Sequence, residues 1–477
     1  MGHPENRADL TKTLVVLAAC LVAGCAVPGH FGRCHVSADL EERTGHGAGA
    51  ETPPCEVAIP DLVSFEDGLS QSEAVALGLW NNPGYQELLA DLKITSADVI
   101  QAHQLANPEV STMFPVSVKQ WEFALTVPLD VLLLRPHRVE VAQLESNRVA
   151  ERLVQDGLDV VRDIRVAYAD LILARQRLQL AEDFAKLRSE LLRIAEARLE
   201  AGAVAELDVT AMRLDSLFSE EHVARTTRDV DLAREKLRFL IGVESTDFEV
   251  EPTGPAEVPS TEFDVDTLVG EAVASRPDLR AVKMAVAAAC ERERLAHYDY
   301  LNFSGILPDI NSKGQNGFEA GPGLRMMLPI FHQNQGAIAR AEAEVERLRR
   351  QYARLRDTAS LEVRQAHTRL LQARQDLEIW RGRVVPQAEV AVATARKALE
   401  EEGVSLLFVL DTTRQLLDAR QRELQAATDV HHAIAELERS VGRRLVDEPA
   451  IDESAEPTVA PEPPLPPEPP SVEEVTP

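Results

Sequence analysis

Residues 345–384 decide the fold, and they read VERLRRQYARLRDTASLEVRQAHTRLLQARQDLEIWRGRV. Small or apolar residues recur every three or four positions, and charged residues fill most of the positions between them. This spacing predicts one helix from Gly336 to Glu402 with a coiled-coil seam, in which Pro386 introduces a kink. At about 1.5 Å per residue this helix is roughly 100 Å long. The seam consists of Val345, Leu348, Tyr352, Leu355, Ala359, Val363, Ala366, Leu370, Ala373, Leu377, Trp380 and Val384.

A helix of this length exceeds the diameter of a compact domain, so it needs partner helices along its seam. The same pattern occurs earlier in the chain, where apolar residues between positions 154 and 194 predict a long helix over 137–201. Gly202 and Gly403 end the two long helices, since glycine tolerates the positive φ of a tight turn. A shorter helix returns after each glycine, to about residue 241 and residue 441. The sequence therefore predicts two long antiparallel helical hairpins.

A strand-like segment precedes each long helix. Apolar and polar residues alternate over 109–129, and again over 307–313 and 318–328, which predicts two hairpins and four strands in the chain. Such alternation is typical of a small membrane β-barrel with lipid outside and water inside. A half-buried soluble hairpin has the same pattern, so the strands alone leave both alternatives open. The third strand, over 307–313, is shorter than a membrane-spanning strand requires.

The recurrence divides the chain into two large repeats, 65–242 and 267–445, joined by a linker over 243–266. Each repeat opens with shorter helices, over 69–106 and 268–295, which fill the length that the returning helices leave uncovered. The tail over 446–477 is acidic and rich in proline, and we expect it to be disordered. The fold class is mainly α, with long antiparallel coiled-coil helices and a small sheet.

The N-terminus has the features of a signal peptide over residues 1–24, because a basic start precedes a short apolar run. The run ends in Leu21-Val22-Ala23-Gly24-Cys25, a bacterial lipobox, so we expect lipidation at Cys25. The alternatives are an uncleaved anchor and an ordinary cleavage site. Residues 25–64 show no periodicity and contain several glycines and prolines, which predicts a lipid-anchored extended arm. Cys34 and Cys55 lie in this arm, and both a disulfide and two free thiols are compatible with their spacing.

Composition excludes several classes of function. The chain of 477 residues carries a formal net charge of −28 and has no cluster of basic residues, which argues against binding nucleic acid. Neither a Gly-rich phosphate loop nor an enzyme signature is present, so we expect no catalysis and no cofactor. His431, His432 and Glu436 have a helical spacing that could bind a metal, but the sequence supplies no further ligand and favours a solvated helix face.

Several motifs together resemble the TolC-like family of outer-membrane efflux and secretion channels, over about residues 65–445. They recur in the same order in both halves of the chain. The matching segments are Leu69-Ser70-Gln71-Ser72-Glu73-Ala74, Asn81-Asn82-Pro83, Arg276-Pro277-Asp278-Leu279, Val127-Pro128-Leu129, Leu328-Pro329-Ile330-Phe331, Ala197-Arg198-Leu199-Glu200-Ala201-Gly202, Leu207-Asp208-Val209 and Val409-Leu410-Asp411.

The resemblance implies a homotrimer in the outer membrane, with a twelve-stranded barrel that a helical tube extends into the periplasm. It implies a passive exit duct of a tripartite efflux pump or a type I secretion system, with a periplasmic adaptor, an inner-membrane pump and outer-membrane lipid as partners. The alternative is a non-channel periplasmic coiled-coil lipoprotein that bridges the envelope layers.

In this family the helical turns far from the membrane dock the adaptor and form the gate. The resemblance places that role on Gly202, Leu207, Asp208, Val209, Gly403, Leu407, Phe408 and Asp411. For Asp208 and Asp411 a second interpretation is local, in which they cap the returning helices or pair with Arg213 and Arg414. Phe408 occupies a place that is often acidic in the family, which argues against an acidic gate ring.

Overall fold

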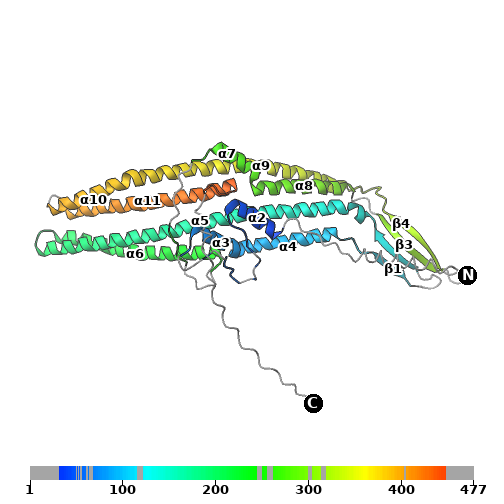
Figure 1. Cartoon of the computed structure of the whole chain (residues 1–477), viewed down its shortest axis with the longest axis horizontal. Helices are drawn as coiled ribbons and strands as arrows, with labels where there is room; N and C mark the ends of the chain where they lie inside the picture. The colour runs from blue at the N-terminus through cyan, green and yellow to red at the C-terminus, as the bar shows by residue number, and fades with distance from the viewer. Residues whose placement is uncertain are drawn as a thin grey trace, which may run out of the picture.

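The computed structural model shows an elongated molecule in which long helices lie side by side and a small sheet extends from one end (Figure 1). The helices contribute most of the length, and the chain passes along it several times. The structure describes residues 32–49, 51, 53, 56–60, 63, 68–114, 122–243, 250–254, 262–298, 303–312, 318–401 and 404–446.

The two halves of the chain contain the same kinds of element in the same order. The first half has α3 (Gln71–Asn81), α4 (Pro83–His103), β1 (Glu109–Met113), β2 (Glu122–Pro128), α5 (Asp130–Glu200) and α6 (Glu206–Ile241). The second half has α7 (Val265–Ser275), α8 (Pro277–Tyr298), β3 (Phe303–Ser312), β4 (Phe318–Met326), α9 (Gln335–Ile379), the π-helical turn η2 (Trp380–Val384), α10 (Val385–Glu400) and α11 (Leu406–Val441). An additional helix, α2 (Arg33–Thr44), precedes both halves.

Local sequence signals set the ends of the shorter helices. Ser70 caps α3 and forms a capping box with Glu73, which satisfies backbone N–H groups at both positions. Asn82 caps α4, whose first residue is Pro83, because the ring fixes a helical φ and the missing N–H is not needed there. The returning helices α6 and α11 end at Gly242 and Gly442, both with positive φ.

The four described strands form one antiparallel sheet in the order β1-β2-β3-β4. The pairing of β2 with β3 joins the two halves of the chain, with Phe123 opposite Ile310. β3 runs from Phe303 to Ser312 and has 10 residues, so the prediction of a short third strand over 307–313 was wrong. Pro308 lies where the pairing of β3 with β4 shifts register, between Ile306 and Asp309. A bulge accommodates proline there, because proline has no N–H to donate to the ladder.

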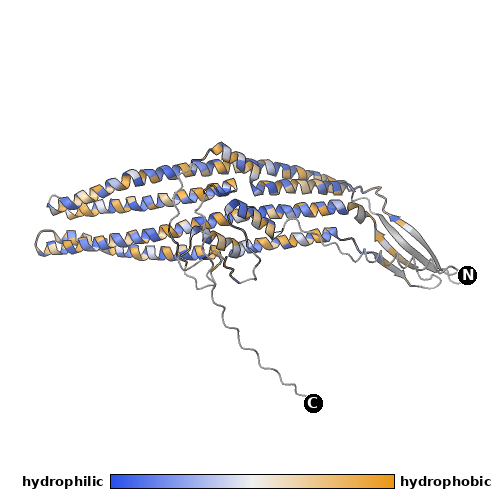
Figure 2. Ribbon diagram, in the orientation of Figure 1, coloured by the Kyte–Doolittle hydropathy of each residue, from blue (hydrophilic) through white to orange (hydrophobic). Residues whose placement is uncertain are grey.

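The helices form a row of four columns. α4 and α6 lie end to end against α5, α8 and α11 lie end to end on the other side of α5, and α9 with α10 forms the last column beside them (Figure 1). One apolar core joins α2, α3, α4, α5 and α6, and a second joins α7, α9 and α11. Apolar and polar residues alternate along every column, as expected for helices with seams (Figure 2). Because α5 and the α8–α11 column each lie between two other columns, α4–α6 and α9–α10 are the two outer columns.

Two predictions about the long helices can be compared with the structure in detail. The first long helix begins at Asp130 rather than at residue 137, and Pro136 lies inside it. Pro136 is the seventh residue of α5 and lies beyond its first turn, so the helix loses one backbone hydrogen bond there. In the second long helix, where a kink at Pro386 was predicted, the regular α-helix is interrupted by the π-helical turn Trp380–Val384 directly before that proline. That wider turn accommodates the carbonyl that Pro386 leaves without a donor.

The expected extended arm over 25–64 was also wrong, because α2 lies within it. Val36 and Leu40 are fully buried against the first-half core, which supplies the stability that a helix of 12 residues lacks in isolation. Arg43 donates hydrogen bonds to the carbonyl oxygens of Gly442 at 2.8 Å and Ser275 at 3.1 Å. α2 thus attaches the N-terminal segment to both halves.

Within the described residues, each helix is either too short or too polar to cross a lipid bilayer.

Candidate functional site

The turn between α5 and α6 is one of the two predicted working ends. Gly202 has φ +70°, and its N–H donates to the Leu199 carbonyl at 2.9 Å while the Ala203 N–H donates to the Arg198 carbonyl at 2.9 Å. These bonds satisfy the last carbonyls of α5, as in a Schellman-type ending. Leu207 is 78% exposed, whereas Val209 is buried. The turn therefore presents an apolar side chain to the outside.

The turn between α10 and α11 has a similar shape at its described end. Ser405 caps α11 and accepts a hydrogen bond from the Phe408 N–H at 3.3 Å. Leu407 and Phe408 are 42% and 51% exposed. Gly403 lies outside the described residues. Sequence reasoning missed the Ser405 cap, although a serine three residues before Phe408 at the start of an apolar run is a helix-start signal.

The two turns share one apolar core, so they form a single end of the molecule. Leu191 and Ala195 of α5 pack with Val209 and Met212 of α6, and the second hairpin adds residues from α10 and α11. The second-hairpin members are Ala395, Leu399, Leu406, Val409 and Leu410. Most predicted turn residues therefore come together, either in this core or exposed beside it.

The local interpretation of the two carboxylates was wrong. Ala205 and Ser405 are the N-caps of α6 and α11, so neither Asp208 nor Asp411 is a cap. Asp208 lies in the first turn of α6, where a negative charge is favourable next to the helix N-terminus. Asp411 is exposed and accepts a hydrogen bond from Gln415 at 2.9 Å.

The predicted arginine partners bind other carboxylates. Arg213 pairs with Glu196 at 2.8 Å, and Arg414 pairs with Asp215 at 2.5 Å. Asp215 is 3% exposed and also lies 3.1 Å from the guanidinium of Arg188 on α5. One carboxylate therefore connects α5, α6 and α11 close to the shared core. Burial lowers the pKa of Arg188, and the charge of Asp215 opposes that effect.

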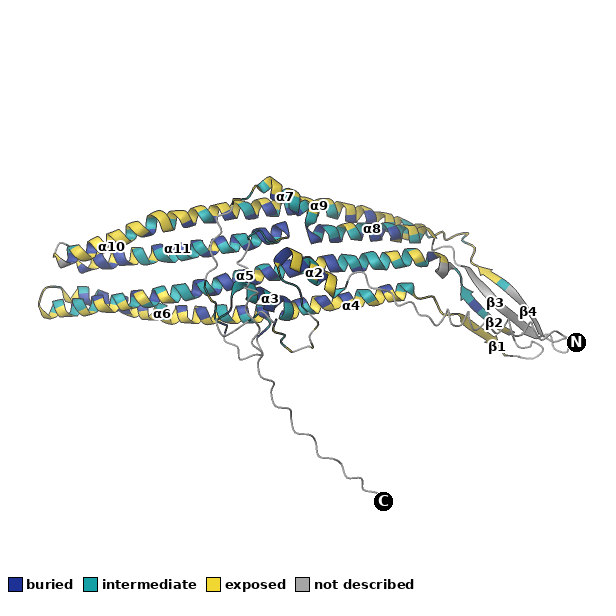
Figure 3. Ribbon diagram, in the orientation of Figure 1, coloured by how far each residue is buried: buried dark blue, intermediate teal, exposed yellow. Residues whose placement is uncertain are grey.

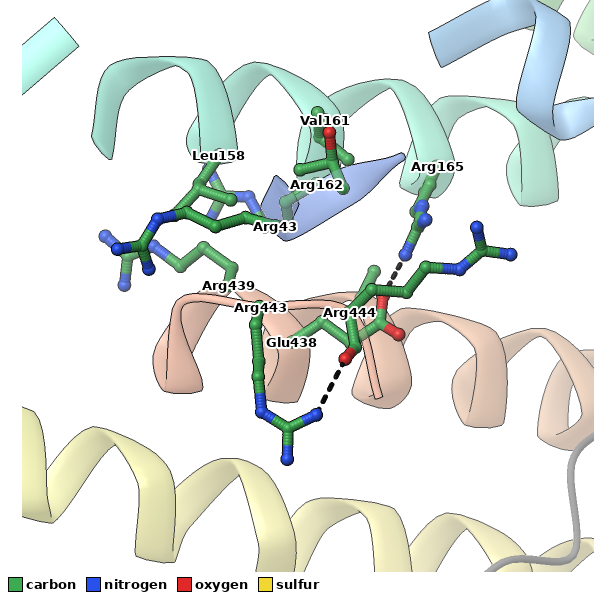
Figure 4. A pocket seen from close by; sticks show the side chains of 11 residues that line it. Arg43, Leu158, Val161, Arg162, Arg165, Glu438, Arg439, Arg443 and Arg444 are labelled. Carbon is green, nitrogen blue, oxygen red and sulfur yellow. Dashed lines mark hydrogen bonds and ion pairs between the residues drawn. The ribbon is translucent and has the colours of Figure 1, made fainter. Parts of the chain in front are cut away.

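Away from this end, α5 and α11 meet along a polar seam, which we define by three ion pairs. Arg165 pairs with Glu438, Arg162 with Glu436 at 3.2 Å, and Arg439 with Asp159 at 2.7 Å. Figure 4 shows Arg165 of α5 directed at Glu438 of α11, among several other arginines. Along this seam the two halves of the chain meet through charges, in contrast to the apolar core that they share at the turns.

The histidines on α11 belong to this polar boundary. His432 lies 3.0 Å from Asp170, and Glu436 is engaged by Arg162. Burial opposes ionisation of Asp170, but hydrogen bonds from His432 and Lys236 outweigh it and lower its pKa. Burial, together with the neighbouring His432, lowers the pKa of His431. His431 and His432 are half-buried, so the prediction of a solvated helix face is wrong for them. The carboxylates near them, Asp170 and Glu436, are already paired with cationic side chains.

The predicted modification sites belong to the N-terminal segment. Cys25 and Cys55 lie outside the described residues, and Cys34 is exposed in the first turn of α2.

Residues 87–243 and 268–443 match the family described as outer membrane efflux protein. The matched segments cover most of both halves, so the chain belongs to this family, and the resemblance to TolC-like channels is confirmed. The protein is an outer-membrane efflux channel component with a helical tube. Family membership favours this function over the alternative of a non-channel periplasmic lipoprotein.

Particular relatives agree with this assignment. The chain is 25% identical to the cobalt-zinc-cadmium resistance protein CzcC of Cupriavidus metallidurans, over 79% of this chain and 90% of that protein. It is 25% identical to the nickel-cobalt-cadmium resistance protein NccC of Alcaligenes xylosoxydans xylosoxydans, over 68% of this chain and 70% of that protein.

Solved structures share the fold. A membrane protein from Pseudomonas aeruginosa superposes with a TM-score of 0.68 at 18% identity, covering 82% of this chain and 99% of that one. The outer-membrane channel OprN has a TM-score of 0.66 at 19% identity, with coverage of 83% and 98%. CusC, whose structures concern transmembrane channel formation, has a TM-score of 0.67 at 17% identity, with coverage of 82% and 98%.

Proposed function

We propose that three copies of this chain assemble into one exit duct that carries divalent transition-metal cations across the outer membrane. In this assembly each copy contributes four strands to a twelve-stranded barrel and four helical columns to a periplasmic tube. A periplasmic adaptor docks at the tip and an inner-membrane pump supplies the energy. The observation that carries the proposal is that, among the described residues, both the sheet and the row of helices end in two open edges.

The sheet has two outer strands, β1 and β4, in the part of the chain that the structure describes. An outer strand presents backbone N–H and C=O groups without ladder partners, and a bilayer offers no water to satisfy them. Pairing β4 of one copy with β1 of the next satisfies these groups. Repeating the step closes the sheet into a barrel without free edges.

The row of helices has the same property. Within the described residues, α4–α6 and α9–α10 each lie beside one other column. The short helices α3 and α7 add further contacts to them, and exposed residues line much of both outer columns (Figure 3). Large apolar side chains are among them, and on α6 they follow a helical stripe of Leu207, Leu214, Phe218, Leu232 and Phe239. The last column carries Leu361, Leu371, Ile379 and Val390. Packing α9–α10 of one copy against α4–α6 of the next buries both sets and extends the barrel as a tube.

The tip supplies a surface for the adaptor. Leu207, Leu407 and Phe408 are exposed beside a core that holds both hairpins in place. Exposed apolar side chains on a rigid support are suited to binding the apolar face of partner helices. Lipidation at Cys25 would anchor each copy to the membrane independently of the barrel.

Two relatives with most of their length matched are named for resistance to cobalt, zinc, cadmium or nickel. This supports divalent transition-metal cations as the cargo. The net charge of −28 is compatible with a duct for cations, since acidic surfaces concentrate them.

Membrane fractionation and planar-bilayer recording test the proposal together. The full-length protein should be found in the outer membrane as a trimer that dissociates on heating, and it should conduct ions. Co-expression with its adaptor and pump should raise the zinc or cobalt tolerance of a sensitive host at least severalfold. A monomeric rod that conducts no ions would contradict the duct, and a conducting trimer without metal tolerance would contradict the cargo alone.

A further inference from the structure

A cluster of three side chains lies where the helices begin beneath the sheet. His137 and Glu140 are on one face of α5, since positions three apart on a helix are neighbours, and Glu291 comes from α8. The His137 Nδ1 atom is 3.0 Å from a Glu291 carboxylate oxygen, and one donor atom from each residue lies within 4.8 Å of the others. The three groups therefore converge on a single point between the two helices.

The residues differ in how far solvent reaches them. Glu291 is 6% exposed, whereas Glu140 is exposed and His137 is intermediate. The His137 ring lies nearly parallel to that of Tyr298, with an interplanar angle of 18°. A buried carboxylate, a half-buried imidazole and an exposed carboxylate form a site that is closed on its inner side and open on its outer side.

The charges around the cluster leave room for a cation. Arg294 pairs with Glu291, but Arg294 is on the same helix and its side chain is 64% exposed. A long exposed side chain compensates a buried carboxylate weakly, because it is mobile and screened by water. A divalent ion at the convergence point would neutralise both carboxylates at bonding distance, and Arg294 can turn to solvent.

The donor set selects a class of ion. One imidazole nitrogen and two carboxylate oxygens, with a further position open to water, is an arrangement suited to zinc. Imidazole nitrogen favours zinc, cobalt, nickel or copper over magnesium and calcium, which prefer oxygen ligands alone.

We propose that His137, Glu140 and Glu291 bind one Zn²⁺-class cation, which fixes the first turns of α5 to the last turns of α8. This is a structural site in the wall and is separate from transport of the cargo. Its position has a physical rationale, because Pro136 removes one backbone hydrogen bond from the start of α5 at the place where the chain leaves the sheet. A metal bridge between neighbouring helices compensates for that loss.

A second cluster of the same residue types serves as an internal comparison for locating the bound ion. Glu293 and His297 of α8 lie close to Glu342 of α9, on the side of α8 away from α5. It has the same composition but contains no buried residue, so we expect weaker binding there. Variants of His137 and His297 therefore distinguish the two positions.

Equilibrium dialysis of the detergent-solubilised full-length protein against buffered zinc tests the site. The protein is prepared without a polyhistidine tag and stripped with a chelator beforehand. We expect one tightly bound zinc per chain, and His137→Ala and Glu140→Gln should each weaken it at least about tenfold. His332→Ala, which removes a histidine outside both clusters, and His297→Ala should leave this zinc in place. Cobalt in the same site should give the visible absorption of a four- or five-coordinate ion, and His137→Ala should abolish it.

Three results would overturn the proposal. They are zinc binding no tighter than millimolar, undiminished zinc binding by His137→Ala and by Glu140→Gln, or loss of the tightly bound zinc in His297→Ala but not in His137→Ala. Glu140 is exposed, so Glu140→Gln should fold normally, and circular dichroism checks this. Ion conductance of the same preparations is recorded separately, because a failed duct and a failed metal site then give different results.

Discussion

One buried arginine connects α8, α9 and α11 within the second half of the chain. Arg276 is 1% exposed and donates to Asp278 at 2.7 Å, to Glu362 at 2.7 Å and to the Ser440 carbonyl at 3.1 Å. Burial by itself lowers its pKa, but hydrogen bonds from the guanidinium to Asp278 and Glu362 reverse the effect and raise it. The charge is therefore retained in the interior because carboxylates surround it.

Replacing Arg276 with alanine should destabilise the protein strongly. The change removes the guanidinium from Asp278, from the Ser440 carbonyl and from Glu362, which keeps only the longer contact with Arg439 at 3.3 Å. Breaking a buried pair in this way costs about 3–5 kcal/mol. We expect the midpoint of thermal unfolding, followed by circular dichroism, to fall by several degrees. Arg356→Ala is the matched control, because Arg356 is half exposed and pairs with its neighbour Asp357 on the same helix. Equal midpoints for the two variants would contradict the structural role of Arg276.

The sequence could predict these residues but not their partners. The segment Arg276-Pro277-Asp278-Leu279 is recognisable as a motif, and the pairing of Arg276 with Asp278 is local. Glu362 and Ser440 are 86 and 164 residues away along the chain, and only the packing of α9 and α11 brings them to Arg276. For the same reason the local alternative considered for Arg414 was nearby Asp411, whereas the structure pairs it with Asp215 across the boundary.

At the scale of elements, periodicity predicted the long helices and the glycines that end them. The pattern extends over many turns, so each apolar position adds to the same signal. α2 could not be predicted in this way, because it has three turns and its stability comes from packing against α5. The start of α5 was misplaced since Pro136 is read as a helix boundary, whereas the helix continues through this proline in its second turn.

Two turn glycines with similar backbone conformations allow the cost of positive φ to be separated from the cost of crowding. Gly202 has φ +70° and its added Cβ would meet nothing within 4 Å, whereas Gly242 has φ +72° and its Cβ would lie 2.1 Å from the Asn81 carbonyl oxygen. Gly202→Ala should therefore cost about 1–2 kcal/mol of stability, from the left-handed conformation alone. Gly242→Ala should cost clearly more, because the backbone of α3 must also move.

Denaturant unfolding of both glycine variants measures the difference. Ala203→Gly is a suitable control for changes in the flexibility of the turn itself. Equal losses in Gly202→Ala and Gly242→Ala would show that the contact between α6 and α3 is loose enough to absorb a methyl group.

For the whole molecule, the sequence supplied the lengths and the structure supplied the order of the columns. The expected helix lengths required shorter helices to complete each returning column, and α4 with α6 and α8 with α11 do so. The sequence could not predict which columns lie outermost. Every helix has an amphipathic pattern, and this pattern shows that one face is buried but not which helix covers it. The exposed stripe on α6 becomes visible only when the neighbours of each helix are known.

That stripe gives the last prediction. Leu232 and Phe239 are 70% and 54% exposed and lie seven residues apart on the same face of α6. Because burial of a large apolar side chain contributes about 1.5–3 kcal/mol, the double variant Leu232→Asp and Phe239→Asp removes about 3–6 kcal/mol from each subunit contact and adds two charges there. We expect light scattering in detergent to show mainly monomers, with helical content unchanged because neither side chain belongs to the core of one copy. Thr227→Asp, an exposed polar position on the same helix, should remain trimeric. A stable trimer in the double variant would place the subunit interface on a different column and remove the main support for closure through α4–α6.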